Sequence, residues 1–156
     1  MATGLDRTDQ RILAALQEDA SRSAAEIADA VGLSQSPCWR RIQRLREEGY
    51  ISKITALLDR KKLGLNAQVF VHVKVLSNDQ ASLTAFAKAI REFPEVMECH
   101  MVLGVFDFLL RVVTKDMEAY EKFHFDTLLR VPNIREVNSF VVAMEVKSTT
   151  AFPIRR

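Results

Sequence analysis

Four arginines lie close together in the first third of this 156-residue sequence, within a run that contains no acidic residue. They are Arg40, Arg41, Arg44 and Arg46, and the acid-free run extends from residue 34 to residue 46. A guanidinium group can neutralise a phosphate, or it can make a two-pronged hydrogen bond to the O6 and N7 atoms of guanine. The run therefore has the chemistry of a nucleic-acid contact.

Helical spacing decides which side chains of this run face outward. Cys38, Ile42 and Leu45 recur at i, i+4 and i+7, which predicts a helix with these three on its buried stripe. Polar and aromatic side chains then share the exposed face, where glutamine can pair with adenine and hydroxyls can hold phosphate. The predicted DNA contacts are Ser34, Gln35, Ser36, Trp39, Arg40, Gln43 and Arg44. Two alternatives remain: the arginines form a merely solvated face, or Trp39 packs against the first helix.

Two further helices are expected before this one. Asp6 can cap a helix that runs to about Glu18 and carries Ile12, Leu13 and Leu16. Ser23-Ala-Ala-Glu26 has the pattern of a capping box, and Gly32 supplies the left-handed residue that ends the second helix. Three residues separate the second and third helices, so the two must cross steeply, as in a helix-turn-helix. We expect this three-helix domain to span residues 1–50.

The periodicity changes after Gly49. Residues 51–58 look like a strand, and the charged, glycine-containing residues 59–66 form a connection, so 51–66 is expected to be a β-strand linker. From residue 67 to 156 the patterns predict strands at 69–75, 96–103, 106–113 and 134–146, with helices near 83–90 and 117–128. The order βαββαβ is typical of a ferredoxin-like sheet. The predicted fold class is thus α+β.

Such a sheet carries both helices on one face and leaves the other uncovered. Val69, Val71 and Val73 fall on one side of the first strand, whereas Phe70 and His72 fall on the other. Pairing with a second copy would hide this mixed face, so we expect at least a dimer.

Composition narrows the class of protein. The chain has 22 Lys+Arg against 20 Asp+Glu, 48% hydrophobic residues, and neither a membrane-length apolar run nor a signal-like N-terminus, which indicates a soluble intracellular protein. Cys38 and Cys99 are expected to be buried or half-buried thiols. His72, His100 and His124 lack the close Cys/His spacings of a zinc site, and no phosphate loop or serine elbow accompanies them. We expect no metal, no cofactor and no catalytic residue.

The motifs of both halves together resemble the Lrp/AsnC family, the feast/famine regulators. They are Leu5-Asp6-x-x-Asp9-x-x-Ile12-Leu13, then Gly32-Leu33-Ser34-x-Ser36-Pro37-Cys38-x-Arg40-Arg41-Ile42-x-Arg44-Leu45-x-x-x-Gly49-x-Ile51, and later Glu98-Cys99-His100 and Gly104-x-Phe106-Asp107-Phe108-Leu109-Leu110. The resemblance covers essentially the whole chain. It implies a DNA-binding transcriptional regulator that dimerises through its sheets, assembles further into tetramers or octamers, and works in the cytoplasm at the nucleoid.

The resemblance also implies an effector site, usually for an amino acid, near the turn after the second strand of the sheet. Carried over, the site residues are Gly104, Val105, Phe106, Asp107, Met117, Phe140, Val141 and Val142. Val105 departs from the acidic or polar residue of many members, which leaves open a changed effector or none. A plainer alternative makes Gly104 a hairpin turn and Asp107 a strand-edge residue.

The expected function is therefore that of a sequence-specific DNA-binding transcriptional regulator whose assembly or DNA binding responds to a small effector, expected to be an amino acid. An effector-independent architectural DNA-binding protein is one alternative, and a small-molecule-binding or catalytic βαββαβ protein with a helical interaction module is another.

Overall fold

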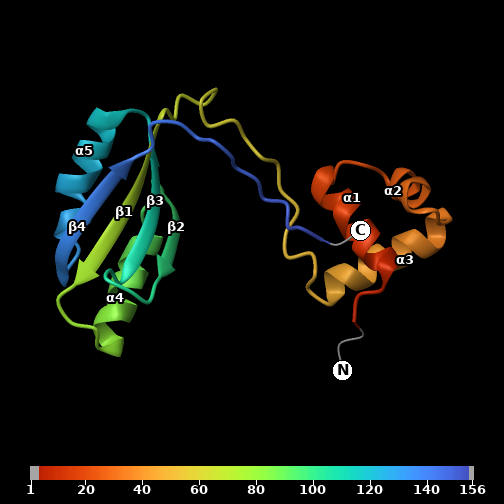
Figure 1. Cartoon of the computed structure of the whole chain (residues 1–156), viewed down its shortest axis with the longest axis horizontal. Coiled ribbons are helices and arrows are strands. Elements are labelled where there is room, and N and C mark those ends of the chain that lie inside the picture. The colour runs from red at the N-terminus through yellow and green to blue at the C-terminus, as the bar shows by residue number, and fades with distance from the viewer. Residues whose placement is uncertain (1–3, 155–156) are drawn as a thin grey trace. The chain divides into compact units, whose positions relative to one another are not determined.

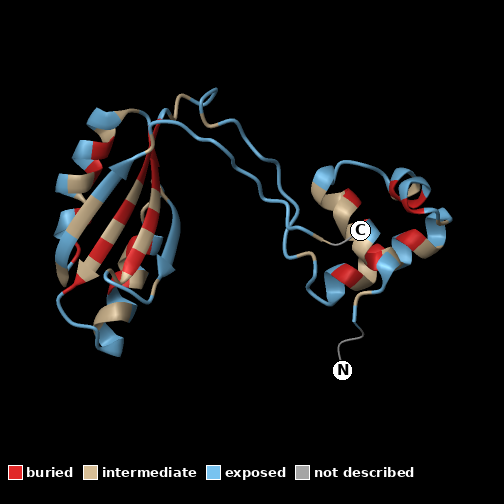
Figure 2. Cartoon of the chain, in the orientation of Figure 1, coloured by how far each residue is buried: buried red, intermediate tan, exposed pale blue. Residues whose placement is uncertain are grey.

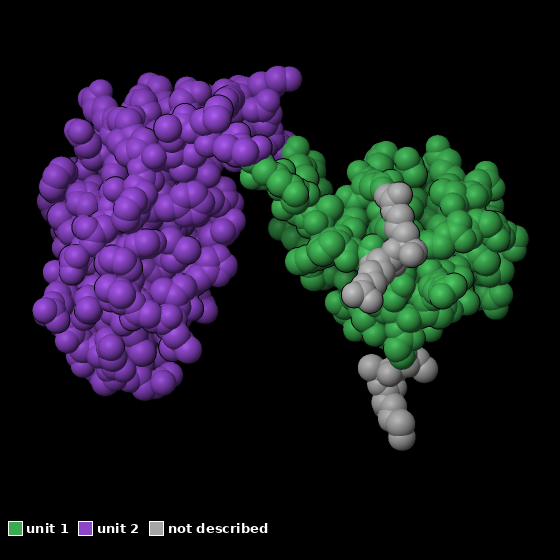
Figure 3. Space-filling model, viewed as in Figure 1, with its two compact units in different colours: residues 1–57, 147–156 green, residues 58–146 purple. Residues whose placement is uncertain are grey.

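The computed structural model describes residues 4–154, which form two compact units (Figure 3). One unit contains the chain up to Leu57 together with the segment from Lys147 onward, and the other contains Leu58–Val146. Each has its own hydrophobic core, and the two cores share no residue. The predicted boundaries differ from these units in two respects: the division falls inside the predicted linker 51–66, and the last segment of the chain belongs to the first unit.

The first unit consists of three helices, α1 (Arg7–Glu18), α2 (Ala24–Val31) and α3 (Gln35–Glu47) (Figure 1). The predicted caps are confirmed: Asp6 and Ser23 each begin a helix with a capping box, and Gly32 ends α2 with φ of 72°. The core is formed by one apolar stripe from each helix, which includes Ile12, Ile27 and Leu45. Burial of these stripes sets how α3 lies on α1 and α2.

The second unit has the predicted order of elements: β1 (Ala67–Val75), α4 (Gln80–Arg91), β2 (Val96–Met101), β3 (Phe108–Thr114), α5 (Met117–Asp126), a 3-10 turn η1 (Leu128–Arg130) and β4 (Ile134–Val141). All neighbouring strands are antiparallel, in the order β2-β3-β1-β4. Both helices pack on the face that carries Val69, Val71, Val73 and Val75, as the buried stripes along β1 and β3 illustrate (Figure 2).

Several predicted strands are shorter in the structure. β4 ends at Val141 rather than residue 146, because its partner β1 begins at Ala67 and Val142 makes the last bond, to the carbonyl of Gln68. β2 and β3 are separated by an irregular loop over residues 102–107.

The predicted strand of the linker is absent. Residues 52–59 have no regular secondary structure, since a strand needs a hydrogen-bonded neighbour and residues 4–154 provide none there. The charged connection that follows is a compact turn, in which Gly64 has φ of 76° and Arg60 donates to the carbonyl of Leu65.

The C-terminal segment is held on α1 by a reciprocal pair of hydrogen bonds. Gln17 Nε2 donates to the carbonyl of Phe152 over 2.8 Å, and the Phe152 amide donates to Gln17 Oε1 over 3.0 Å. The side-chain amide of Gln17 thus pairs with the backbone as a neighbouring strand would, which explains why this segment belongs to the first unit.

Candidate functional site

The exposed face of α3 carries most of the predicted DNA contacts. Cys38, Ile42 and Leu45 are buried as predicted, with 6% exposure at most. Trp39 is 53% exposed, so about half of this residue is open to solvent. Ser34, Gln35, Ser36 and Arg40 are exposed, whereas Gln43 is half-buried. Cationic, amide and aromatic groups therefore do share one outward face.

Ser34 is the N-cap residue of α3, but its side chain makes no hydrogen bond to the helix amides. In α1 and α2 the capping side chain accepts from the amide of the third helical residue, whereas in α3 that residue is Pro37, which has no amide hydrogen, so the free donors are the amides of Gln35 and Ser36. Unpaired amides at a helix start attract phosphate oxygens. The beginning of α3 thus adds polar donors beside the arginines.

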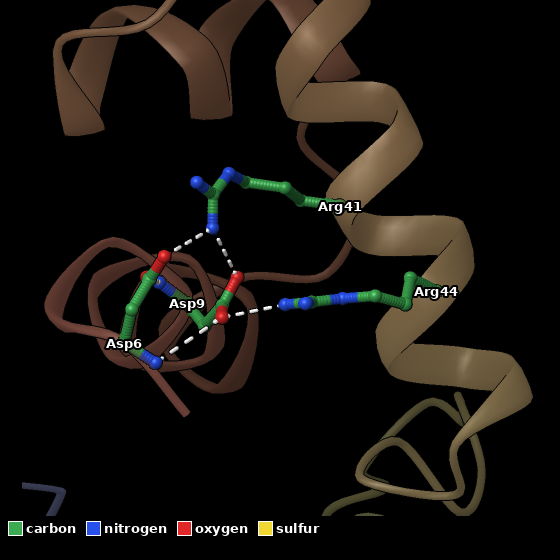
Figure 4. A network of polar contacts seen from close by, with 4 residues as sticks. All are labelled: Asp6, Asp9, Arg41 and Arg44. Atoms are coloured by element: carbon green, nitrogen blue, oxygen red, sulfur yellow. Dashed lines mark hydrogen bonds and ion pairs between the residues drawn. The ribbon is translucent and has the colours of Figure 1, made fainter. Parts of the chain in front are cut away.

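Two arginines of the run point toward the aspartates at the start of α1 (Figure 4). Arg44 Nη2 lies 2.5 Å from Asp9 Oδ2, and Arg41 Nη1 lies 2.8 Å from Asp9 Oδ1 and 2.6 Å from Asp6 Oδ2. Asp9 is 1% exposed, so its carboxylate is covered by these partners. Arg44, which is predicted to contact DNA, pairs with Asp9 of α1 in the structure.

The same aspartates also cap α1. Asp6 Oδ1 accepts from the Asp9 amide over 2.7 Å, and Asp9 Oδ2 accepts from the Asp6 amide. The Asp9 amide and the Arg41 side chain lower the pKa of Asp6, while bonds to these carboxylates raise the pKa of Arg41 and of Arg44. Sequence reasoning missed this network, although acids three residues apart and arginines three residues apart were a signal for it.

The predicted effector residues are only partly brought together. The His72 ring lies 4.5 Å from that of Phe106 and 4.8 Å from that of Phe140, on the sheet face opposite the helices. Asp107 anchors the loop, because its Oδ2 accepts from the Val75 amide over 2.8 Å. Gly104 is exposed and a side chain there would meet open space, so within one chain this position does not demand glycine.

Met117 lies apart from that cluster. It begins α5, after the end of β3, whereas the loop with Gly104 precedes the start of β3. Seven strand residues separate the two positions, which is roughly 20 Å. Val141 and Val142 lie beyond Phe140, toward the β1 end that begins at residue 67.

A separate cavity of about 430 Å³ lies between α4 and β2 and contains none of the predicted effector residues. Its lining includes Ile90, Phe108 and Cys99.

Cys38 is a buried free thiol as expected, but Cys99 is exposed, contrary to expectation, because β2 is an edge strand. Within residues 4–154 no three His, Cys, Asp or Glu side chains gather as metal ligands. No helix in the described part of the chain is long and apolar enough to cross a membrane.

Comparison with known proteins defines the class. Residues 5–46 match the AsnC-type helix-turn-helix domain, and residues 68–152 match the Lrp/AsnC ligand binding domain. A helix-turn-helix unit followed by this sheet is the architecture of a DNA-binding regulator. The chain belongs to the Lrp/AsnC family of transcriptional regulators, and its relatives are named as regulators rather than enzymes.

Individual relatives cover nearly the whole chain. The proline dehydrogenase transcriptional activator of Rhizobium radiobacter is 39% identical over 93% of both chains. The leucine-responsive regulatory protein of Escherichia coli K12 is 38% identical over 97% of this chain and 92% of its own. A Neisseria meningitidis regulator solved as an L-methionine complex is 35% identical, with a TM-score of 0.92 over 96% of this chain and 97% of that one.

Proposed function

We propose that this protein binds specific double-stranded DNA through the exposed face of α3, and that an amino acid modulates this binding. The observation that carries the proposal is the outward position of Trp39 and Arg40 on the second helix of a tightly joined pair. A helix held in this way fits the major groove. Its place of action would be the cytoplasm, at the nucleoid.

Each side chain of this face has a distinct role in the proposal. Arg40 forks to guanine or neutralises a phosphate, and Gln43 pairs with adenine. Ser34, Gln35 and Ser36 hold the backbone phosphate nearest the start of α3, with its first amides. Trp39 supplies apolar contact beside them.

Substitution of Arg40 tests whether the exposed face of α3 contacts DNA. Arg40→Ala should weaken specific binding by about 1–3 kcal/mol in a gel-shift titration against a genomic fragment that the unaltered protein retards. Arg130→Ala is the matched control, because Arg130 is an exposed arginine of the second unit. Unchanged affinity of Arg40→Ala would count against the assignment.

The amino-acid part of the proposal draws on the ligand-binding domain and on the relatives. One solved relative holds L-methionine, and another is named for its response to leucine. In this chain, the cluster of Phe106, His72 and Phe140 offers an aromatic wall, and the loop 102–107 offers backbone amides. An aromatic wall suits an apolar side chain, and amides suit its carboxylate.

Calorimetric titration with L-methionine, L-leucine and then the other amino acids tests this response. We expect a saturable heat for one or a few of them, and loss of that heat in Phe106→Ala. Phe125→Ala, an exposed phenylalanine on α5, is the control. No heat with any amino acid would favour the effector-independent architectural protein.

We also propose that the open sheet face pairs with a second copy. Phe140 lies on this face beside Phe70 and is 50% exposed. A partner chain would cover this exposed apolar surface. Phe70→Glu should therefore shift sedimentation velocity profiles toward the monomer, whereas Phe125→Glu should not.

A further inference from the structure

We propose that Asp9 sets the charge of the exposed face of α3 by pairing with Arg44 and, together with Asp6, with Arg41. As a result, Arg40 and Arg46 alone supply the cationic phosphate contacts of α3. This inference rests on the proposed DNA binding. It assigns Asp9 the role of a positioning residue on α1 that acts through the arginines of α3.

The first support is geometric. Both carboxylate oxygens of Asp9 accept from α3, one from Arg44 over 2.5 Å and one from Arg41 over 2.8 Å. Asp9 is buried, whereas the side chains of Arg41 and Arg44 remain about one-third exposed. The arginines therefore reach inward across the surface of α1 to meet an acid that cannot turn to solvent.

The second support is the balance of charge. Two carboxylates and two guanidinium groups form a network without net charge. A phosphate that drew Arg44 away would leave the buried Asp9 less compensated, and an uncompensated buried charge is costly. The paired arginines are thus poor phosphate ligands.

The third support is the contrast with the other two arginines of the run. Arg40 and Arg46 are exposed, and their side chains make no hydrogen bond or ion pair with residues 4–154. Their charges are available to DNA. The acid-free run of four arginines therefore presents two effective cations at its surface.

The salt dependence of DNA binding reports how many arginines of α3 neutralise DNA phosphates. Each neutralised phosphate contributes about −0.9 to the slope of log affinity against log salt concentration. We therefore compare Arg40→Gln, Arg46→Gln and Arg44→Gln on one DNA fragment, between roughly 50 and 200 mM salt. Arg40→Gln and Arg46→Gln should each flatten the slope by about one ion per DNA-contacting unit, whereas Arg44→Gln should leave it unchanged.

Release of Arg44 should have the opposite effect. Asp9→Asn keeps the shape of the side chain but removes its charge, so the slope should steepen by about one ion per DNA-contacting unit. The double variant Asp9→Asn with Arg44→Gln should return to the original slope. A general loss of structure would not produce a steeper slope or its reversal.

Asp29→Asn is the matched control, because it removes one exposed acid of α2 that has no arginine partner on α3. An equal steepening in Asp29→Asn, or an equal flattening in Arg44→Gln and Arg40→Gln, would overturn the inference. If circular dichroism shows that Asp9→Asn does not fold, the slopes of the three arginine variants test the inference without it. Failure of the unaltered protein to bind any genomic fragment would instead refute the proposed function.

Discussion

Asp9 and Arg44 lie 35 positions apart in the sequence, yet Asp9 Oδ2 and Arg44 Nη2 are 2.5 Å apart. Asp9 belongs to the first turn of α1 and Arg44 to the last turns of α3, so this contact joins the two helices at their surface. The hydrophobic stripes bring α1 and α3 together, and the ion pairs favour one rotation of α3 about its axis. That rotation decides which side chains of α3 face outward.

We expect Asp9→Ala to destabilise the first unit by about 1–3 kcal/mol, because two arginines lose their acceptor and the start of α1 loses half of its capping box. Trp39 is the single tryptophan and lies on α3, so its fluorescence during urea unfolding reports this unit. Asp29→Ala, which removes an exposed carboxylate, should change stability by less than about 0.5 kcal/mol. Equal effects of the two variants would contradict a structural role of the network.

Because the two units have separate hydrophobic cores, a cavity made in one core should destabilise that unit and leave the stability of the other nearly unchanged. Leu110 and Leu45 are both fully buried, the first in the sheet unit and the second in the helical unit. Leu110→Ala should destabilise the sheet unit by about 2–5 kcal/mol and leave the Trp39 transition nearly unchanged. Leu45→Ala should instead destabilise the helical unit, which shifts the Trp39 transition, and leave the sheet unit nearly unchanged. Calorimetry and Trp39 fluorescence together distinguish the two results, and a common shift in both variants would argue for one cooperative unit.

The hydrogen bonds between Gln17 and Phe152 predict that the C-terminal segment is protected on α1. Gln17→Ala removes both bonds, so amide hydrogen exchange in residues 148–154 should become faster. Gln10→Ala is the control, because Gln10 lies on the same helix without a side-chain hydrogen bond in the described residues. Equally fast exchange in the unaltered protein would show that the segment is not held there in solution.

Burial lowers the pKa of His124 below its ordinary value of 6.5, and its Nδ1 atom is buried without a partner in residues 4–154. The folded state therefore favours the neutral form of this histidine more than the unfolded state does. As the pH falls through 6.5, the unfolded state takes up the proton first, so stability decreases until the pH passes the lower pKa of the folded state.

His124→Phe should flatten this part of the stability profile, measured by urea unfolding of the sheet unit at several pH values. His100→Gln, at an exposed position on β2, should keep the dependence seen in the unaltered protein. If His124→Phe and the unaltered protein lose the same stability between neutral pH and pH values below 6.5, another group is responsible.

The helices and their ends were predictable because their signals are local. Asp6, Ser23 and Gly32 act on amides or backbone angles within a few residues, and the stripe of α3 follows from its periodicity. The order of strands and helices was predictable for the same reason. Strand ends were less so, because β4 stops where its partner β1 begins.

The sequence by itself determined the order of helices and strands, the buried stripe of α3 and the presence of a cationic run, since these depend on residue type and local spacing. Only the tertiary structure decided that Arg44 pairs with Asp9, that Met117 and Gly104 lie at opposite ends of β3, and that Phe152 returns to Gln17. These are contacts between positions far apart in the chain, or separations imposed by a strand between them. They depend on how packed helices and paired strands place distant side chains, which no local pattern encodes.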